Sequence, residues 1–151
     1  MSANRSVAIG KLVRWRAFQE AIAERAYQQA SAQALEAQRA TESAQAAADA
    51  IVQRRDALLA ERAIDLALLQ AIGDFEMQAA EFVRQRRDAQ REAERVRDDA
   101  LAAHLEARAR TRVAETRFDE VAAQERDQEE KRMFDRMASL LVAAGGGSSH
   151  D

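Results

Sequence analysis

Few residues of this 151-residue chain could do chemistry, and their spacing argues against a catalytic or metal site. The only histidines are His104 and His150, there is no cysteine, and no Glu-x-x-His pair occurs. The metal sites of helical bundles therefore have no ligands here, and no glycine-rich phosphate loop or nucleophile elbow is present either. Acidic neighbours such as Asp98 and Asp99 would point apart on a helix. We expect no enzyme activity, no metal and no cofactor.

Four arginines, at positions 84, 87, 91 and 95, stand at helical spacing and in isolation could bind phosphates. Acidic residues interleave with this stripe, and the chain carries 23 basic against 26 acidic residues, a net charge of −3. This balance favours a solvated or interhelical salt-bridge role over a nucleic-acid interface. A histidine can act as a proton switch, but the position of His104 among Ala and Leu residues favours a partly exposed side chain without a function.

The elements that carry these residues should be helices. There is no proline, aromatics are 5% of the chain, and Ala, Glu, Gln, Arg and Leu, all strong helix formers, dominate. Such small side chains suit a thin interface between helices better than a wide core. No apolar run approaches the roughly 20 residues that span a bilayer, and residues 1–15 lack the continuous apolar stretch of a signal peptide. We expect a cytoplasmic or peripheral protein.

Glycine gives the clearest breaks in the helical pattern. Gly73 suits a helix end because it tolerates a left-handed conformation, and Asp74 suits the N-cap of a following helix. We therefore predict an all-α fold in which two long helices form an antiparallel coiled-coil hairpin. Its single domain spans 1–144, with helix 1 over about 6–72, a turn at 73–74, helix 2 over about 75–143, and a flexible tail over 145–151. The alternative is one continuous helix of about 140 residues that dimerises in parallel, with Gly73 tolerated at roughly 1 kcal/mol.

Large apolar residues at helical spacing are predicted to form the seam between the two helices. In the first helix these are Leu12, Trp15, Phe18 and Ile22, and in the second they are Phe75, Ala79, Phe82 and Val96. A turn at 73–74 places residue i opposite roughly residue 147 − i. The opposed pairs would then include Ile51 with Val96, Val7 with Leu140 and Arg55 with Glu92.

The two ends of the chain combine apolar and charged side chains. Basic residues surround Leu12 and Trp15 near the amino terminus, and the densely charged stretch 125–132 is followed by apolar residues from Met133 to Leu141. The predicted hairpin brings these ends together, so that Trp15 packs near Met133 and Met137. Part of this surface would hold the ends of the two helices together. The apolar and arginine side chains not needed for that packing fit a protein-binding surface.

Two segments resemble the FliJ/YscO family, the stalk proteins of flagellar and virulence type III secretion export machines. They are residues 11–16 (KLVRWR) with Glu20 and Ala21, and the Arg- and Glu-rich stretch 108–136, which contains RFDE at 117–120 and EEKR at 129–132. The resemblance implies a bacterial, non-enzymatic antiparallel coiled coil in the cytoplasm, peripheral to the inner-membrane secretion apparatus. Its paired termini would contact a hexameric export ATPase and its tip the export gate protein, with export chaperones as further partners.

The resemblance also assigns residues to two contacts. The ATPase would be met by Leu12, Arg14, Trp15, Arg16, Phe18, Phe118 and Arg132. The tip contact would use Phe75, Ala79, Phe82 and Arg86. Neither nucleic acid nor an integral membrane segment is expected. Two other functions fit the same composition: a self-assembling structural coiled-coil spacer, and a helical chaperone that binds exposed client segments with its apolar ends.

Overall fold

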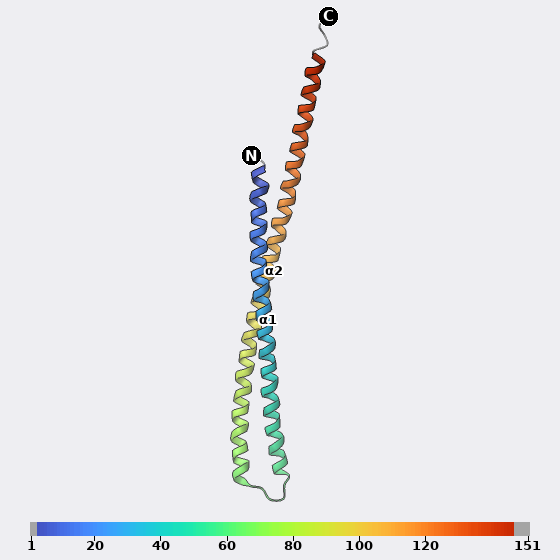
Figure 1. Ribbon diagram of the computed structural model, residues 1–151. Helices are drawn as coiled ribbons and strands as arrows, with labels where there is room; N and C mark the ends of the chain where they lie inside the picture. The colour runs from blue at the N-terminus through green and yellow to red at the C-terminus, as the bar shows by residue number, and fades with distance from the viewer. Residues whose placement is uncertain (1–2, 147–151) are drawn as a thin grey trace. The chain divides into compact units, whose positions relative to one another are not determined.

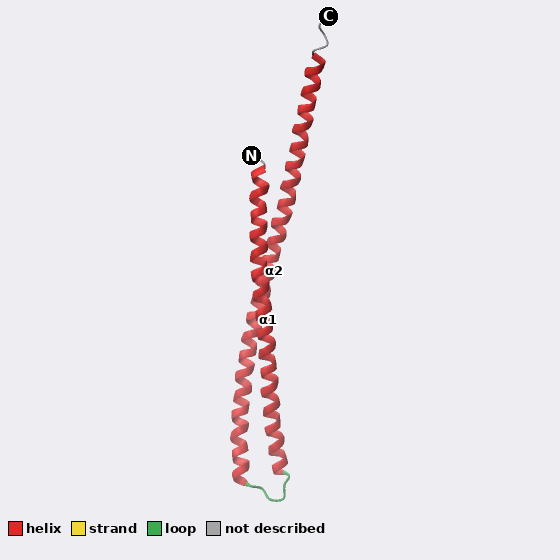
Figure 2. Cartoon of the chain, in the orientation of Figure 1, coloured by secondary structure: helices red, strands yellow, loops and turns green. Residues whose placement is uncertain are grey.

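The protein is an all-α helical hairpin whose two long helices pack against each other (Figure 1). The computed structural model describes residues 3–146, in which α1 spans Ala3–Leu59 and α2 spans Leu66–Gly146. A short loop over residues 60–65 joins them, and no strand occurs in this range (Figure 2). Neither described helix contains an apolar stretch long enough to cross a membrane. The predicted fold class is confirmed, and the continuous-helix alternative is excluded.

The position of the turn was predicted wrongly, and with it the helix boundaries 6–72 and 75–143. The turn lies at 60–65, whereas Gly73 and Asp74 lie inside α2, and no described glycine has a positive φ. Asp65 provides the N-cap of α2, because its Oδ1 accepts hydrogen bonds from the backbone N–H of Ala67 at 3.0 Å and of Leu68 at 3.2 Å. These bonds satisfy two of the amides that have no partner within the first helical turn.

Removing the Asp65 cap should destabilise the hairpin. We expect Asp65→Ala to lower the free energy of unfolding by about 1 kcal/mol, since two helix-start amides lose their side-chain acceptor. Asp65→Ser is the matched control, because a serine hydroxyl can accept the same bonds, and it should retain most of the stability. Urea unfolding followed by circular dichroism measures both. Equal stability of Asp65→Ala and the unaltered chain would contradict the assigned cap.

At its other end α2 continues through Gly146. Gly145 and Gly146, predicted to begin a flexible tail, are therefore helical, and the remainder of that tail, 147–151, lies outside the described residues.

The chain divides into two compact units, each of which contains parts of both helices. The turn unit comprises Ile22–His104 and includes the loop at 60–65. The end unit combines Met1–Ala21 of the first helix with Leu105–Asp151 of the second.

Contacts between α1 and α2 fix the pairing of the helices. In the turn unit Arg55 pairs with Glu76, and the ring of Tyr27 stacks on His104 with centroids 6.3 Å apart. In the end unit the backbone N–H of Ser6 donates to Glu125. Each pair of residue numbers adds to 131, so residue i lies near residue 131 − i and the predicted value of 147 is wrong. His104 is half-buried against Tyr27, so it has a packing role that the sequence did not suggest.

Small residues of α1 pack against larger aliphatic residues of α2 in the seam of the turn unit. The buried apolar side chains there are Ala30, Ala34 and Ala44 of α1 with Ile72 and Val83 of α2. Alanine allows two helices to approach closely and buries less apolar area than leucine would. The helices are therefore held together by many small contacts.

The predicted seam of large residues is wrong for most of its members. Exposed fractions are 43% for Leu12, 53% for Trp15, 57% for Phe18 and 54% for Ile22, and Phe75, Phe82 and Val96 are exposed as well. Only Ala79 of that set is half-buried. The three-and-four spacing that includes Ala30 and Ala34 continues back to Ile9, Val13 and Ala23, which are half-buried in place of the larger residues. The small residues set the phase of the seam and leave the aromatic side chains outside.

Candidate protein-binding site

An open groove of about 380 Å³ lies between the two helices of the end unit. Its apolar lining comes from Leu12 of α1 and from Ala109, Val113 and Ala114 of α2. Ala114 is buried, and Val113 is 70% exposed at the open side. A groove with an apolar floor and an accessible apolar rim is typical of a protein-binding surface.

Close contacts between α1 and α2 hold the groove in place. Gly10 lies against the ring of Phe118, so that a Cβ at position 10 would be 3.5 Å from Cε2 of the ring. Oε1 of Glu125 accepts the hydrogen bond of the Ser6 backbone N–H at 3.2 Å, which caps the amino-terminal turn of α1 from the opposite helix. Val121, 4% exposed, lies between these two contacts along α2. The beginning of α1 is therefore fixed against α2 beside the groove.

An exposed apolar stripe extends from the groove around α1. It is formed by Leu12, Trp15 and Phe18, and the rings of Trp15 and Phe18 lie 6.0 Å apart, tilted by 33°. Each step of three residues turns the side chain by about −60° around a helix. The stripe thus runs from the edge of the groove toward the outer face of α1.

Basic side chains concentrate around the groove. Residues 5–21 and 105–118 contain eight basic and three acidic residues, a local net charge of +5. Arg110 pairs with Glu106, Arg117 pairs with Glu120 at 3.8 Å, and Arg16 donates to Gln19. Among residues 3–146, no ion pair is formed by Lys11, Arg14, Arg108 or Arg112. The basic residues around Leu12 and Trp15 are evident in the sequence, whereas the fold adds those of residues 105–118 to the same surface, although the net charge of the whole chain is −3.

Six of the seven residues predicted for the ATPase contact lie in the end unit at or near this groove. They are Leu12, Arg14, Trp15, Arg16, Phe18 and the half-buried Phe118. Arg132 is not among them, because it lies 14 residues beyond Phe118 on α2, about 20 Å along the helix. The predicted packing of Trp15 near Met133 and Met137 is also wrong, since these methionines are 62% and 60% exposed. The altered pairing of the helices places Trp15 opposite the region of residue 116.

The four residues predicted for the tip lie along α2, away from the loop. Phe75 follows the start of α2 by nine residues and Arg86 by twenty, which correspond to about 14 and 30 Å. Ala79 faces the seam, and the Arg86 guanidinium lies 4.8 Å from the centroid of Phe82. The residues beside the loop that the prediction missed are Leu59, Ile64, Leu66 and Leu68, all exposed. The signal that could have found them is Asp65 directly before an apolar run.

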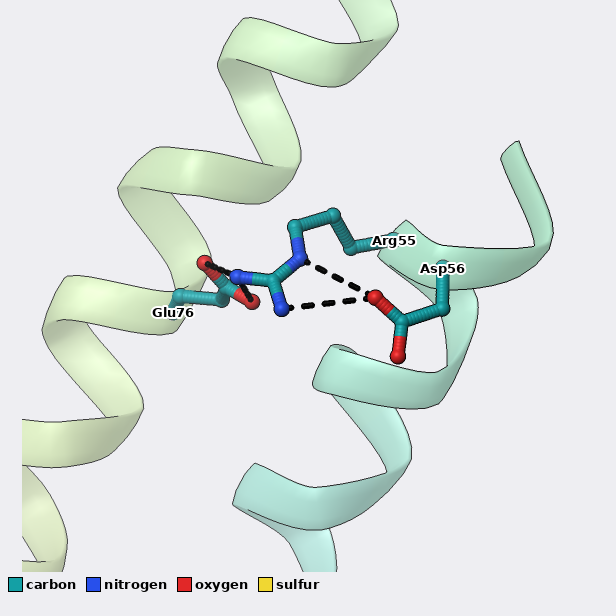
Figure 3. A network of polar contacts seen from close by, with 3 residues as sticks. All are labelled: Arg55, Asp56 and Glu76. Atoms are coloured by element: carbon teal, nitrogen blue, oxygen red, sulfur yellow. Dashed lines mark hydrogen bonds and ion pairs between the residues drawn. The ribbon is translucent and has the colours of Figure 1, made fainter. Parts of the chain in front are cut away.

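Arg55 links the two helices of the turn unit through a polar network (Figure 3). Its Nη1 lies 2.9 Å from Oε1 of Glu76 on α2, while Nε and Nη2 contact Oδ1 of its neighbour Asp56 at 3.4 and 3.3 Å. The predicted partner of Arg55, Glu92, instead pairs with Arg95 on its own helix at 2.6 Å. The hydrogen bond and positive charge of Arg95 lower the pKa of Glu92, and the same interaction raises the pKa of Arg95.

Three of the four arginines in the α2 stripe form ion pairs within that helix, and the fourth, Arg87, donates a hydrogen bond to Gln45 of α1 at 2.8 Å. Arg84 pairs with Glu81, Arg91 with Asp88, and Arg95 with both Glu92 and Asp99. These pairs agree with the predicted solvated salt-bridge role.

The described part of the chain contains no cluster of three or more side chains that could hold a metal ion. Its most distinctive surface is the apolar, basic groove of the end unit. Comparison of the chain with protein-family models, with curated proteins and with solved structures finds no match.

Proposed function

We propose that this protein is a non-enzymatic stalk of a bacterial type III secretion export apparatus. In this proposal the end unit binds the hexameric export ATPase in the cytoplasm at the inner membrane. The turn unit contacts the export gate protein, and export chaperones are further partners of the helices.

The proposal rests on one observation: residues from both chain regions that were predicted to contact the ATPase line the same groove. Leu12 and Arg16 from α1 line it together with Arg117 from α2, directly before Phe118. These residues belong to the two segments, KLVRWR and RFDE, on which the family resemblance rests. The local charge of +5 supports an acidic partner surface, and the exposed Trp15 and Phe18 support an apolar centre in that contact.

For the gate contact the fold favours a different set of residues from those first predicted. Leu59, Ile64 and Leu66 surround the loop and are 48%, 47% and 76% exposed. Exposed apolar residues at a loop between two helices can insert into a partner surface. We therefore place the proposed gate contact at the loop.

The ATPase contact can be tested with two double variants and the purified export ATPase of the same organism. Trp15→Ala with Phe18→Ala, and Lys11→Glu with Arg14→Glu, should each weaken binding by about tenfold or more, because they remove the apolar centre or reverse the charge. All four side chains are exposed, so helix content by circular dichroism should not change. Biolayer interferometry with immobilised hairpin gives the affinities.

Matched controls are available on the turn unit. Met77→Ala removes an apolar side chain that is 75% exposed, and Arg62→Glu reverses an exposed charge in the loop. Both should bind the ATPase like the unaltered chain. Full affinity in both groove variants would contradict the placement of the contact, and no binding of the unaltered chain to the ATPase would contradict the proposed function.

A further inference from the structure

The last part of α2 carries an apolar face that no described residue covers. Every residue from 126 to 146 is exposed, and Figure 1 shows this orange and red part of α2 continuing past the beginning of α1 in the end unit. Its large apolar side chains are Met133, Phe134, Met137, Leu140 and Leu141, which are between 60% and 74% exposed. Single exposed apolar residues need no explanation, but a contiguous set of this size does.

This face is not a continuation of the seam within the hairpin. The three-and-four spacing of the seam on α2 runs through Ala114, Phe118, Val121 and Glu125. The same spacing continues through Gln128, Arg132, Asp135 and Ser139, all of them polar. The apolar positions 133 and 140 each follow such a residue by one, which is a rotation of about 100° around the helix. A helix packed on this segment in the way that α1 packs on the rest of α2 would therefore contact polar side chains. The apolar face lies about 100° around the helix from that position.

The spacing of the apolar face indicates a second helix as its occupant. Met133, Met137, Leu140 and Ala144 follow one another at intervals of four, three and four, which is the pattern of a coiled-coil seam over two heptads. Residues 126–146 contain four basic and four acidic side chains, so the segment has no net charge. That balance gives no attraction to an anionic lipid surface or to nucleic acid.

We propose that this face binds the same segment of a second copy of the chain in the antiparallel direction. The intervals of four, three and four residues are the same from either end of the segment, as a two-fold symmetric interface requires. In the antiparallel pair Met137 lies opposite Leu140 of the partner, and Met133 lies opposite the small Ala144. Phe134 then extends the apolar contact toward Leu141 of the partner. This inference is independent of the proposed secretion function.

Charge disfavours the parallel arrangement of the same two segments. The seam spacing continues backward from Met133 to Glu130 and Arg126. A parallel pair would place Glu130 against Glu130 and Arg126 against Arg126, and like charges opposite each other are unfavourable. The antiparallel pair places neither residue against its own copy.

The size of the face predicts a weak dimer. Five large side chains in each copy, with on the order of 100 Å² of exposed surface apiece, give about 1,000 Å² in total. Stable interfaces bury about 1,200–2,000 Å², so this contact lies just below that range. We expect a dissociation constant in the micromolar range, with the monomer predominating in dilute solution.

Sedimentation velocity of the full chain over about 1–300 µM tests the proposal. The unaltered chain should change from monomer to dimer over this range, and Met137→Glu with Leu140→Glu should weaken the association by at least about tenfold. The matched control is Leu66→Glu with Met77→Glu, which places the same charges at two residues of α2 that are 76% and 75% exposed in the turn unit. The control should dimerise like the unaltered chain. A chain that stays monomeric throughout, or a dimer that the 137 and 140 substitutions leave unchanged, would overturn the proposal.

The absence of cysteine from the sequence allows the direction of pairing to be tested directly. Met137→Cys and Leu140→Cys chains, mixed in equal amounts and oxidised with glutathione, should form chiefly the mixed disulfide, because these positions face each other in the antiparallel pair. Random pairing would give about half mixed dimers. A predominance of the two homodimers would overturn the antiparallel arrangement.

Discussion

Val121→Asp should lower the free energy of unfolding of the end unit by about 3 kcal/mol or more, because it places an unpaired carboxylate where only 4% of the side chain is exposed. Val121 lies between the contacts that Phe118 and Glu125 make with α1. Separation of the helices would let the new carboxylate reach water. Urea unfolding should therefore shift to lower concentration, and amide exchange in residues 3–21 should accelerate.

The same substitution at Val113 is the matched control. Val113 is on the same helix and is 70% exposed, so Val113→Asp should change the unfolding free energy by less than about 0.5 kcal/mol. Val121→Ala separates loss of packing from burial of charge, and it should cost about 1–2 kcal/mol. If Val121→Asp and Val113→Asp were equally stable, Val121 would not belong to the seam.

Substitution of Gly73 should have the second large effect on the free energy of unfolding. The sign of the effect depends on where the chain turns. Inside α2, Gly73→Ala should stabilise the protein by about 1 kcal/mol, because alanine is the better helix former and a Cβ at this position meets nothing within 4 Å. Gly73→Pro should destabilise it by about 3 kcal/mol, since proline removes a helical hydrogen bond and clashes with the preceding turn. Thermal and urea unfolding measure both variants.

A turn at 73–74 would give the opposite result for the alanine variant. A glycine that ends a helix in the left-handed conformation resists replacement by alanine, which would then destabilise the hairpin. Ala63→Pro is the control, because residue 63 lies in the loop and should accept proline with less loss than position 73.

The hairpin could be predicted from the sequence, whereas the place of its turn could not. Absence of proline and the dominance of helix formers favour an all-α fold over the other fold classes. A glycine inside a helix costs about 1 kcal/mol and an N-cap contributes about as much, so local signals at Gly73 and Asp65 are of similar size. The packing of both helices decides between them, and it favours the pairing that buries Ile72 and Val83.

The candidate site was predicted in part. Leu12, Trp15 and Phe18 were chosen for their size and spacing, and they are exposed beside the groove. They were also expected to form the seam, because large apolar residues usually dominate buried positions. That rule failed because alanines set the phase of the seam on α1, and the positions of this phase do not include Leu12, Trp15 or Phe18. The basic character of the groove depends on which distant residues meet, and composition does not contain that information.

The alanine seam has a consequence for axial sliding of one helix along the other. Moving α1 by one heptad in the turn unit would replace Ala30 with Ala37, and Ala37 with Ala44, so these seam positions would keep an alanine. The same move would replace the buried Ala34 with Thr41 and Ala44 with Ile51, which disfavours the shifted alignment. Other groups add to this specificity through contacts with the opposite helix. Arg55 with Glu76 and Tyr27 with His104 are such groups, since a shift of seven residues would separate both pairs by about 10 Å. These few polar and aromatic contacts thus reinforce the one alignment in which Ala34 and Ala44 lie at buried positions.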